Sequence, residues 1–268
     1  MTCIDAVEES SRLEPRTLPG NRVGLLCFMG AHAGLGARDF ETAWQAARTG
    51  LQDPAVLRYA QLRIQPPPRA PAGSPELSMV VDGIEEFWLR DEAAMSVFAS
   101  PENLERLFAA LPLSALTIVR FTEAPVVDAL EAGEPTDSMI KRLVVLVRKE
   151  GWSHQQFLRH WVEVHRPLAR AAAGRHSRYH QLLVLDHLRN PAGLRDHGVR
   201  IDGLSESWFR DESALLAGAA TPQGQALIAD NRLYVQASRK LFFHEFELPV
   251  APAAPAHASR PSAGIATP

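Results

Sequence analysis

The sequence predicts an α+β protein in which two tandem β-α-β-β-α-β repeats close one intramolecular α/β barrel. Residues 81–92 (VDGIEEFWLRDE) return as residues 201–212 (IDGLSESWFRDE), at an offset of 201 − 81 = 120. Apolar periodicity also gives each half the same order of strands and helices. That order is the ferredoxin-like motif, in which helices cover one face of a four-stranded antiparallel sheet. Each half therefore leaves an apolar face that its twin can cover.

The first half contains all the predicted elements of one repeat. Gly50 ends its first helix, because glycine readily adopts the backbone conformation of a helix stop. A Pro-rich loop at 66–76 separates the two central strands. The predicted strands are 23–29, 57–65, 78–89 and 115–123, and the predicted helices are 39–49, 92–99 and 101–110.

The second half repeats this order. Ser153 and Gln156 form a capping box ahead of its first helix. The spacing of Phe157, Trp161, Val164 and Leu168 gives this helix a stripe that faces the core. Pro167 is expected to end or kink the helix, because proline has no N–H and crowds the preceding turn. The predicted strands are 139–148, 179–186, 201–209 and 241–247, with two short helices capped by Asp211 and Thr221.

The composition shifts divide the chain into five segments. These are a tail (1–20), a first repeat (21–127), a linker (128–138), a second repeat (139–248) and a tail (249–268). The tails are polar or rich in Pro, Ala and Ser, and are expected to be disordered because such segments cannot bury a core. The linker lies in a stretch rich in Pro, Gly and acidic residues.

Composition narrows the function classes. The net charge of −3, without long basic runs, argues against nucleic acid as a partner. The first residues lack the pattern of a secretory leader, and no apolar run approaches the roughly 18–20 residues of a membrane helix. The two cysteines have no metal or redox spacing. A cytoplasmic protein without membrane association is expected.

His165 is the first candidate for catalysis. Eight of the ten histidines lie between His154 and His244, so chemistry is expected in the second repeat. At the predicted helix end, the helix dipole favours the protonated imidazole and burial opposes it, which suits a general acid or base. The alternative is a structural cap on a backbone carbonyl. The aligned residue of the first half is Arg48, so the first repeat is predicted to be a degenerate, structural copy.

Glu206 is the second candidate. On the strand 201–209, Leu204, Glu206 and Trp208 alternate onto one face. A buried, unpaired glutamate would cost several kcal/mol, so Glu206 is expected either to reach a polar cavity or to pair with a histidine or arginine. We expect it to face the cavity and to orient His165 or act itself. The alternative is a structural ion pair that both halves repeat, since Glu86 occupies the same place in the first half.

Five further side chains are predicted to contact a substrate. Trp161, Tyr179 and Trp208 are expected to form the walls of a pocket. Tyr179 and His180 point to opposite faces of their strand, so only one of them can line a given cavity. His244 on the last strand has a weaker claim of the same kind.

A metal or nucleotide site is not expected. His160 and His165 are five residues apart, roughly 140° around an α-helix, and so would not hold one ion together. No His-Glu-x-x-His or paired Cys-x-x-Cys is present. The glycines at 30, 34 and 36 lack the lysine of a phosphate loop and the spacing of a dinucleotide fingerprint.

The motifs Trp161-x3-His165-x-Pro167-Leu168 and 202–209 (DGLSESWF) resemble the EthD family, whose members are ferredoxin-like proteins of the dimeric α/β-barrel superfamily. The resemblance covers 139–248 well and 23–127 more weakly, because the first half has Arg48 and Gly50 in place of the His and Pro. It implies activities as varied as cofactor-free oxygenation of polyphenols, lactone isomerisation, polyketide dehydration or decarboxylation, haem peroxidation and accessory roles. It also implies that His165 acts on aromatic or hydrophobic metabolites.

These observations together predict a small-molecule lyase or isomerase with dehydratase-like acid–base chemistry. Its substrate would be a hydrophobic or aromatic metabolite, and it would use no metal or nucleotide cofactor. One alternative is a cofactor-independent monooxygenase that acts on a polyphenol. Another is a noncatalytic binding or accessory protein. A homodimer is compatible with either, although the duplication removes the need for a second chain to close the barrel.

Overall fold

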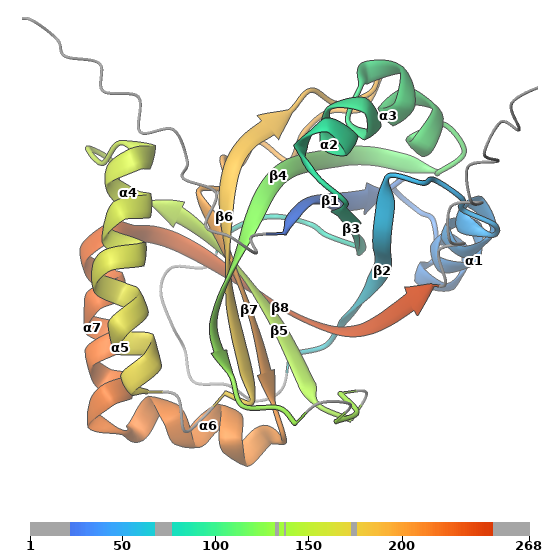
Figure 1. Ribbon diagram of the computed structural model, residues 1–268. Coiled ribbons are helices and arrows are strands. Elements are labelled where there is room, and N and C mark those ends of the chain that lie inside the picture. The colour runs from blue at the N-terminus through green and yellow to red at the C-terminus, as the bar shows by residue number, and fades with distance from the viewer. Residues whose placement is uncertain (1–21, 68–76, 132–133, 137, 173–175, 249–268) are drawn as a thin grey trace, which may run out of the picture.

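The computed structural model describes residues 22–67, 77–131, 134–136, 138–172 and 176–248 (Figure 1). The two predicted tails, most of the loop 66–76 and parts of the linker lie outside these residues. Among the helices that are described, none is long and apolar enough to cross a membrane.

Both repeats have the predicted order of elements. The first contains β1 (Val23–Ala31), α1 (Ala37–Arg48), β2 (Val56–Gln65), β3 (Gly83–Leu89), α2 (Glu92–Phe98), α3 (Pro101–Phe108) and β4 (Leu113–Asp128). The second contains β5 (Ile140–Arg148), α4 (His154–His160), a π-helix η1 (Trp161–His165), α5 (Arg166–Ala171), β6 (Arg178–Leu188), β7 (Gly203–Phe209), α6 (Glu212–Ala220), α7 (Pro222–Tyr234) and β8 (Val235–Leu248).

The eight strands form one closed barrel in the order β1-β3-β2-β8-β5-β7-β6-β4, which confirms the predicted fold. Each repeat supplies four antiparallel strands, and two antiparallel seams, β2 with β8 and β4 with β6, join the repeats. β4 is longer than predicted because its end pairs with β6 of the other repeat, and β8 is longer because residues 235–240 pair with β5 of its own repeat. Pro125 is tolerated in β4 because the register shifts beside it.

The barrel interior is filled mainly by apolar side chains from both repeats. Leu26 and Phe28 of the first repeat meet Leu143, Val145 and other interior residues of the second. The apolar face that each sheet would expose alone is thereby covered, as predicted. The predicted cavity between the sheets is correspondingly small and polar, and it lies among the charged residues of one region of the barrel wall.

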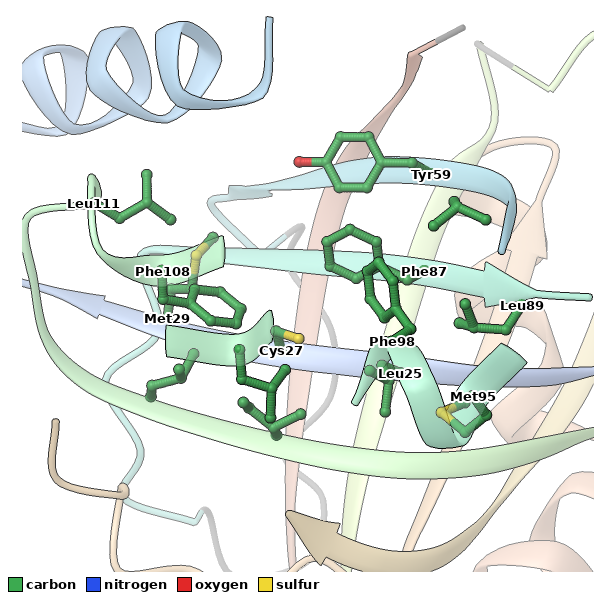
Figure 2. Packing of buried hydrophobic residues seen from close by; sticks show 14 of the residues in the cluster. Leu25, Cys27, Met29, Tyr59, Phe87, Leu89, Met95, Phe98, Phe108 and Leu111 are labelled. Carbon is green, nitrogen blue, oxygen red and sulfur yellow. The ribbon is translucent and has the colours of Figure 1, made fainter. Parts of the chain in front are cut away.

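The helices of each repeat cover the outside of its own sheet. Those of the first repeat lie on the opposite side of the barrel from α4, α5 and α7 (Figure 1). In the first repeat, Leu25, Cys27 and Met29 of β1 pack in one buried cluster with Phe87 and Phe98 (Figure 2). Burial raises the pKa of the Cys27 thiol well above its usual value, so this cysteine behaves as a small apolar side chain.

Of the two outcomes predicted for Pro167, an end or a kink of the helix, the first is wrong, because the helix continues past this proline. The helix changes to π hydrogen bonding at η1 and continues to Ala171 as α5. Proline cannot donate the next helical hydrogen bond, and the change of pattern immediately before it accommodates the missing N–H. His165 therefore lies within the helix, and the predicted effect of a helix C-terminus on its charge does not apply.

The π turn also changes which side chains face the sheet. The α-helical pattern predicts an inward Val164, but Val164 is 44% exposed, whereas His165 is 6% and Ala169 is 2% exposed. The wider turn shifts the inward positions by one residue after Trp161. This shift is what buries His165.

Candidate active site

His165 forms a dyad with an aspartate that the sequence analysis did not single out. Its Nδ1 lies 2.8 Å from Oδ2 of Asp230, and both side chains are buried. Asp230 is supplied by α7, which packs against α5. The predicted partner Glu206 makes no contact with His165.

The same carboxylate also binds His160. His160 Nε2 lies 2.8 Å from Oδ1 of Asp230, so each carboxylate oxygen holds one imidazole. The argument that His160 and His165 diverge by roughly 140° assumed an α-helix and is wrong here. The Arg166 N–H donates to the Trp161 carbonyl five residues earlier, and this turn brings the two histidines to one partner.

The carboxylate sets the position of the proton on His165. Burial raises the pKa of Asp230, but hydrogen bonds and attraction from His165 and His160 outweigh it, so the pKa lies below its usual value. An ionised carboxylate only accepts hydrogen bonds, so Nδ1 of His165 carries the proton. Within the described part of the chain, Nε2 of His165 has no hydrogen-bond partner. In the neutral imidazole, Nε2 is therefore a base with a free lone pair.

The helix and sheet beside His165 provide several polar groups. Gln181 on β6 donates through Nε2 to the Trp161 carbonyl at 3.1 Å, and its Oε1 accepts from Arg166 Nε at 2.8 Å. Burial raises the pKa of Tyr179 to about 12, which keeps its hydroxyl protonated. The Trp161 Nε1 and the Ser207 hydroxyl are buried, and neither has a hydrogen-bond partner among the described residues.

The equivalent place in the first repeat is closed by a buried ion pair. Arg48 donates through Nε and Nη2 to the two oxygens of Glu85, at 2.6 and 2.8 Å. Trp44 Nε1 and the Tyr59 hydroxyl each donate to Oε1 of Glu85 at 2.7 Å. All four polar side chains of this group thus satisfy one another.

Two amino-acid differences remove this ion pair from the second repeat. At the 120-residue offset Ser205 stands for Glu85, and His165 stands for Arg48 in the aligned helices. A serine cannot reach as far as a glutamate, so Trp161 Nε1 loses the acceptor that Trp44 has. The second repeat therefore keeps buried donors without partners, Trp161 Nε1 and the Ser207 hydroxyl, on the face of the sheet that carries its helices.

Glu206 lies on the opposite face of the sheet, in the barrel interior. With His180 and Trp208 it lines a polar cavity of about 250 Å³. Burial raises the pKa of Glu206 well above its usual value, and the nearby Glu86 raises it further. His180 Nδ1 lies 2.6 Å from Glu123 Oε1. The expectation that Glu206 faces a cavity is met, but its expected pairing with His165 is wrong, because alternation along β7 sends Ser205 and Ser207 to the helix side.

The predicted site residues thus occupy three separate places. His165, Trp161 and Tyr179 lie between the helices and the sheet of the second repeat. Glu206, His180 and Trp208 lie in the barrel. His244 lines a larger cavity of about 780 Å³ beside the end of α1, where the two repeats join. Tyr179 and His180 are on opposite faces of β6, as expected.

Asp230 carried a signal in the sequence that was missed. On α7, Leu227, Asp230 and Tyr234 lie at i, i+3 and i+7, and all three are buried. An aspartate on the buried stripe of a helix requires a partner, which a cluster of histidines in the same repeat can provide. Among the described residues, no group of three or more His, Cys, Asp or Glu side chains is arranged to hold a metal ion.

Comparison with protein families places these residues in a known domain. The EthD domain family model matches residues 149–238, a segment that includes both His165 and Asp230. The second repeat therefore contains an EthD domain. The match lies within the second repeat, where the histidine motif is intact. No curated protein sequence matched the chain.

Solved structures share the fold at low sequence identity. An anthrone oxidase-like protein superposes with a TM-score of 0.60 and 11% identity, over 87% of this chain and 96% of that one. A "putative monooxygenase" from Fusobacterium nucleatum gives a TM-score of 0.50 and 9% identity, over 84% and 92%. At these identities the likeness establishes the barrel fold alone, and the chemistry has to be argued from the site.

Proposed function

We propose that this EthD protein is a small-molecule enzyme in which His165 is the general acid–base and Asp230 orients it. The observation that carries the proposal is the hydrogen bond from Nδ1 to the Asp230 carboxylate, with Nε2 left without a partner. A carboxylate behind an imidazole fixes its tautomer and stabilises its protonated form during proton transfer. Asp230 thereby takes the orienting role first expected of Glu206.

The surroundings favour a hydrophobic or aromatic substrate that carries a carbonyl or phenolic oxygen. Trp161 and Tyr179 are buried aromatic side chains between the helices and the sheet, and the unpaired Trp161 Nε1 and Ser207 hydroxyl are donors that an oxygen acceptor would satisfy. An oxygen that gains negative charge during the reaction would be stabilised by such donors.

The proposed reaction is of the lyase or isomerase type. Nε2 of His165 removes a proton from the carbon next to a carbonyl, and the electron pair of the C–H bond moves to the carbonyl oxygen as an enolate. In a dehydration, the enolate expels a hydroxyl group from the next carbon, and the imidazolium returns its proton so that water leaves. In an isomerisation, the proton returns to a different carbon. Neither route uses a metal or nucleotide cofactor.

A cofactor-independent monooxygenase is the second candidate. It begins with the same proton removal, after which the carbanion of a polyphenol reacts with molecular oxygen. The names of two structural relatives, an anthrone oxidase-like protein and a "putative monooxygenase", favour this candidate. Oxygen consumption separates it from the lyase or isomerase.

The test is turnover of a panel of anthrones, hydroxyketones and polyphenols, followed by mass spectrometry and an oxygen electrode. The variants are His165→Ala and, as a matched control, His32→Ala, which removes an exposed histidine of the first repeat. We expect turnover to be lost in the first and kept in the second. Turnover that survives His165→Ala would disprove the role of this residue, and binding without any turnover would favour an accessory protein.

The site is built within one chain, because the two repeats close the barrel together. A homodimer would associate through other exposed surfaces and would not be needed for activity. Light scattering of the purified protein, with turnover measured over a range of protein concentrations, tests this expectation.

A further inference from the structure

A cavity of about 780 Å³ opens between the end of α1, β2 and the end of β8, where the two repeats join. Its volume is in the range of small-ligand pockets. We propose that this cavity binds a neutral hydroxylated aromatic molecule of the phenol class, whose hydroxyl group donates to Oε1 of Gln61. This site is independent of the proposed reaction at His165.

The cavity exists because α1 is shorter than its counterpart. α1 ends at Arg48, and Gly50 follows in the left-handed region with φ of 74°. In the second repeat the equivalent helix continues through α5 to Ala171. The residues after Arg48 therefore leave open a volume that a helical turn occupies in the other repeat.

Comparison of the two repeats shows which group has lost its partner. In the second repeat, Oε1 of Gln181 accepts a hydrogen bond from Arg166 at 2.8 Å. Gln61 is the aligned glutamine, and Thr49 aligns with Arg166. The Gln61 side chain lines the cavity and is fully buried, and its Oε1 has no partner among the described residues. A ligand donor at this oxygen would replace the missing arginine.

A chain of hydrogen bonds fixes the amide of Gln61 in this orientation. The Tyr59 hydroxyl has one proton, which it donates to the Glu85 carboxylate at 2.7 Å. Tyr59 can therefore only accept from Gln61, whose Nε2 lies 3.2 Å away. The NH₂ group of Gln61 is thus committed to Tyr59, and Oε1 is the atom left to accept from a ligand.

The other walls favour a planar apolar body. Arg63 lies over the Phe246 ring, 3.7 Å from its centroid, and forms a flat surface with it. Leu51, Met139 and Leu248 add apolar surface to the lining. A ring stacks well on such a surface.

The charges of the cavity favour a neutral ligand over a cation. Its two glutamates are already paired, Glu245 with Lys141 at 2.7 Å and Glu247 with Arg58 at 3.0 Å. No carboxylate of the described lining is left to hold an ammonium group. A hydroxyl group supplies the donor that Gln61 lacks without adding charge.

Arg48, which replaces the histidine of the second repeat, does not supply a base to this cavity. It is held by Glu85 and stays charged, because attraction to Glu85 outweighs the effect of burial on its pKa. We therefore infer that this cavity holds a ligand, while the proposed base, His165, lies elsewhere in the second repeat.

The test is titration of the purified full chain with p-cresol, followed by calorimetry and by ligand-observed NMR. 4-Methylanisole, which lacks the hydroxyl proton, is the matched control ligand. Because one hydrogen bond contributes about 1 kcal/mol, we expect p-cresol to bind on the order of fivefold more tightly. Equal affinities would overturn the role assigned to Gln61.

Three variants locate the binding. Thr49→Arg restores the arginine of the second repeat and is expected to abolish p-cresol binding, and Gln61→Met is expected to abolish the preference over 4-methylanisole. His165→Ala is expected to leave this binding unchanged, whatever its effect on turnover. Thermal unfolding shows whether each variant is folded. If Thr49→Arg does not fold, the result for Gln61→Met tests the role of Gln61 by itself. Binding that survives Thr49→Arg and is lost in His165→Ala would place the ligand in the second repeat and overturn the proposal, as would no binding to the wild type.

Discussion

Asp230→Asn is the substitution that tests the dyad most directly. It keeps the shape of the side chain, removes its charge and converts one of two acceptor oxygens into an NH₂ donor. His160 and His165 each occupy one oxygen at 2.8 Å in the wild type. The asparagine can accept from only one of them, so the other imidazole must turn or change its tautomer.

The structure sets the size of the effect. The side chains of Asp230 and His165 are 6% and 7% exposed, and that of His160 is 18% exposed, so solvent screens these contacts weakly. Two hydrogen bonds to a charged group contribute about 3–6 kcal/mol, and one neutral bond recovers about 1 kcal/mol. We therefore expect Asp230→Asn to lower the free energy of unfolding by about 2–5 kcal/mol.

The effect should depend on pH in a defined direction. The pKa of Asp230 is lowered in the folded protein, so its carboxylate stabilises the fold above the pKa of the unfolded chain, which is about 3.9. This stabilisation is lost as the pH falls through the lower, folded-state pKa. The difference between wild type and Asp230→Asn should be largest near neutral pH and should shrink below about pH 4.

Urea unfolding between pH 3 and pH 7 measures the stability, and ¹⁵N NMR of the imidazoles reports which nitrogen of His165 carries the proton. Asp186→Asn is the matched control, because Asp186 is 45% exposed and pairs with Arg120 at the surface, where the loss should stay below about 1 kcal/mol. The reasoning is refuted if both variants lose the same small amount, or if Nε2 of His165 is the protonated nitrogen in the wild type.

Three further substitutions test other parts of the structure. Glu206→Gln should stabilise the protein at neutral pH, because the raised folded-state pKa of Glu206 means that stability is lost as the pH rises; urea unfolding should show the gain disappear at acid pH. Arg48→Met should cost about 3–5 kcal/mol in the same assay by leaving Glu85 buried and unpaired, and a loss below 1 kcal/mol would contradict the ion pair. Gly203→Ala should cost about 1–3 kcal/mol, because the new Cβ would lie 2.7 Å from the Trp161 ring, and an unchanged melting temperature would contradict that packing.

The barrel was predictable because it follows from local patterns of apolar residues and from the repeat in the sequence. Alternation along each strand and the 120-residue repeat identified eight strands and the faces that they bury. The end of β4 was missed, since residues such as Pro125 become part of a strand only by pairing with the other repeat. Long-range pairing of this kind leaves little trace in a local pattern.

The site was predictable only in part. The motif singled out His165 as a candidate, and the alternation of β7 correctly separated Glu206 from Ser205. The partner of His165 was missed because the inference assumed α-helical geometry, and the π turn places His160 and His165 toward α7 instead. The π turn contains one more residue than an α-helical turn, and the sequence before Pro167 gives no sign of it. This turn determines that Asp230 is the acid that contacts His165.

The comparison of the repeats explains why only the second one is a candidate for catalysis. In the first repeat, Glu85 accepts hydrogen bonds from Arg48, Trp44 and Tyr59, so these three donors are already paired. In the second, the serine at the glutamate position leaves the buried Trp161 Nε1 unpaired, at a cost of about 1–3 kcal/mol. An unpaired buried donor does not stabilise the fold, so stability does not account for it. Such donors could instead stabilise an oxygen that gains negative charge in the reaction proposed for His165. The first repeat thus serves as the comparison within the same chain: there, Glu85 pairs the donors at this place, as expected where the residues only stabilise the fold.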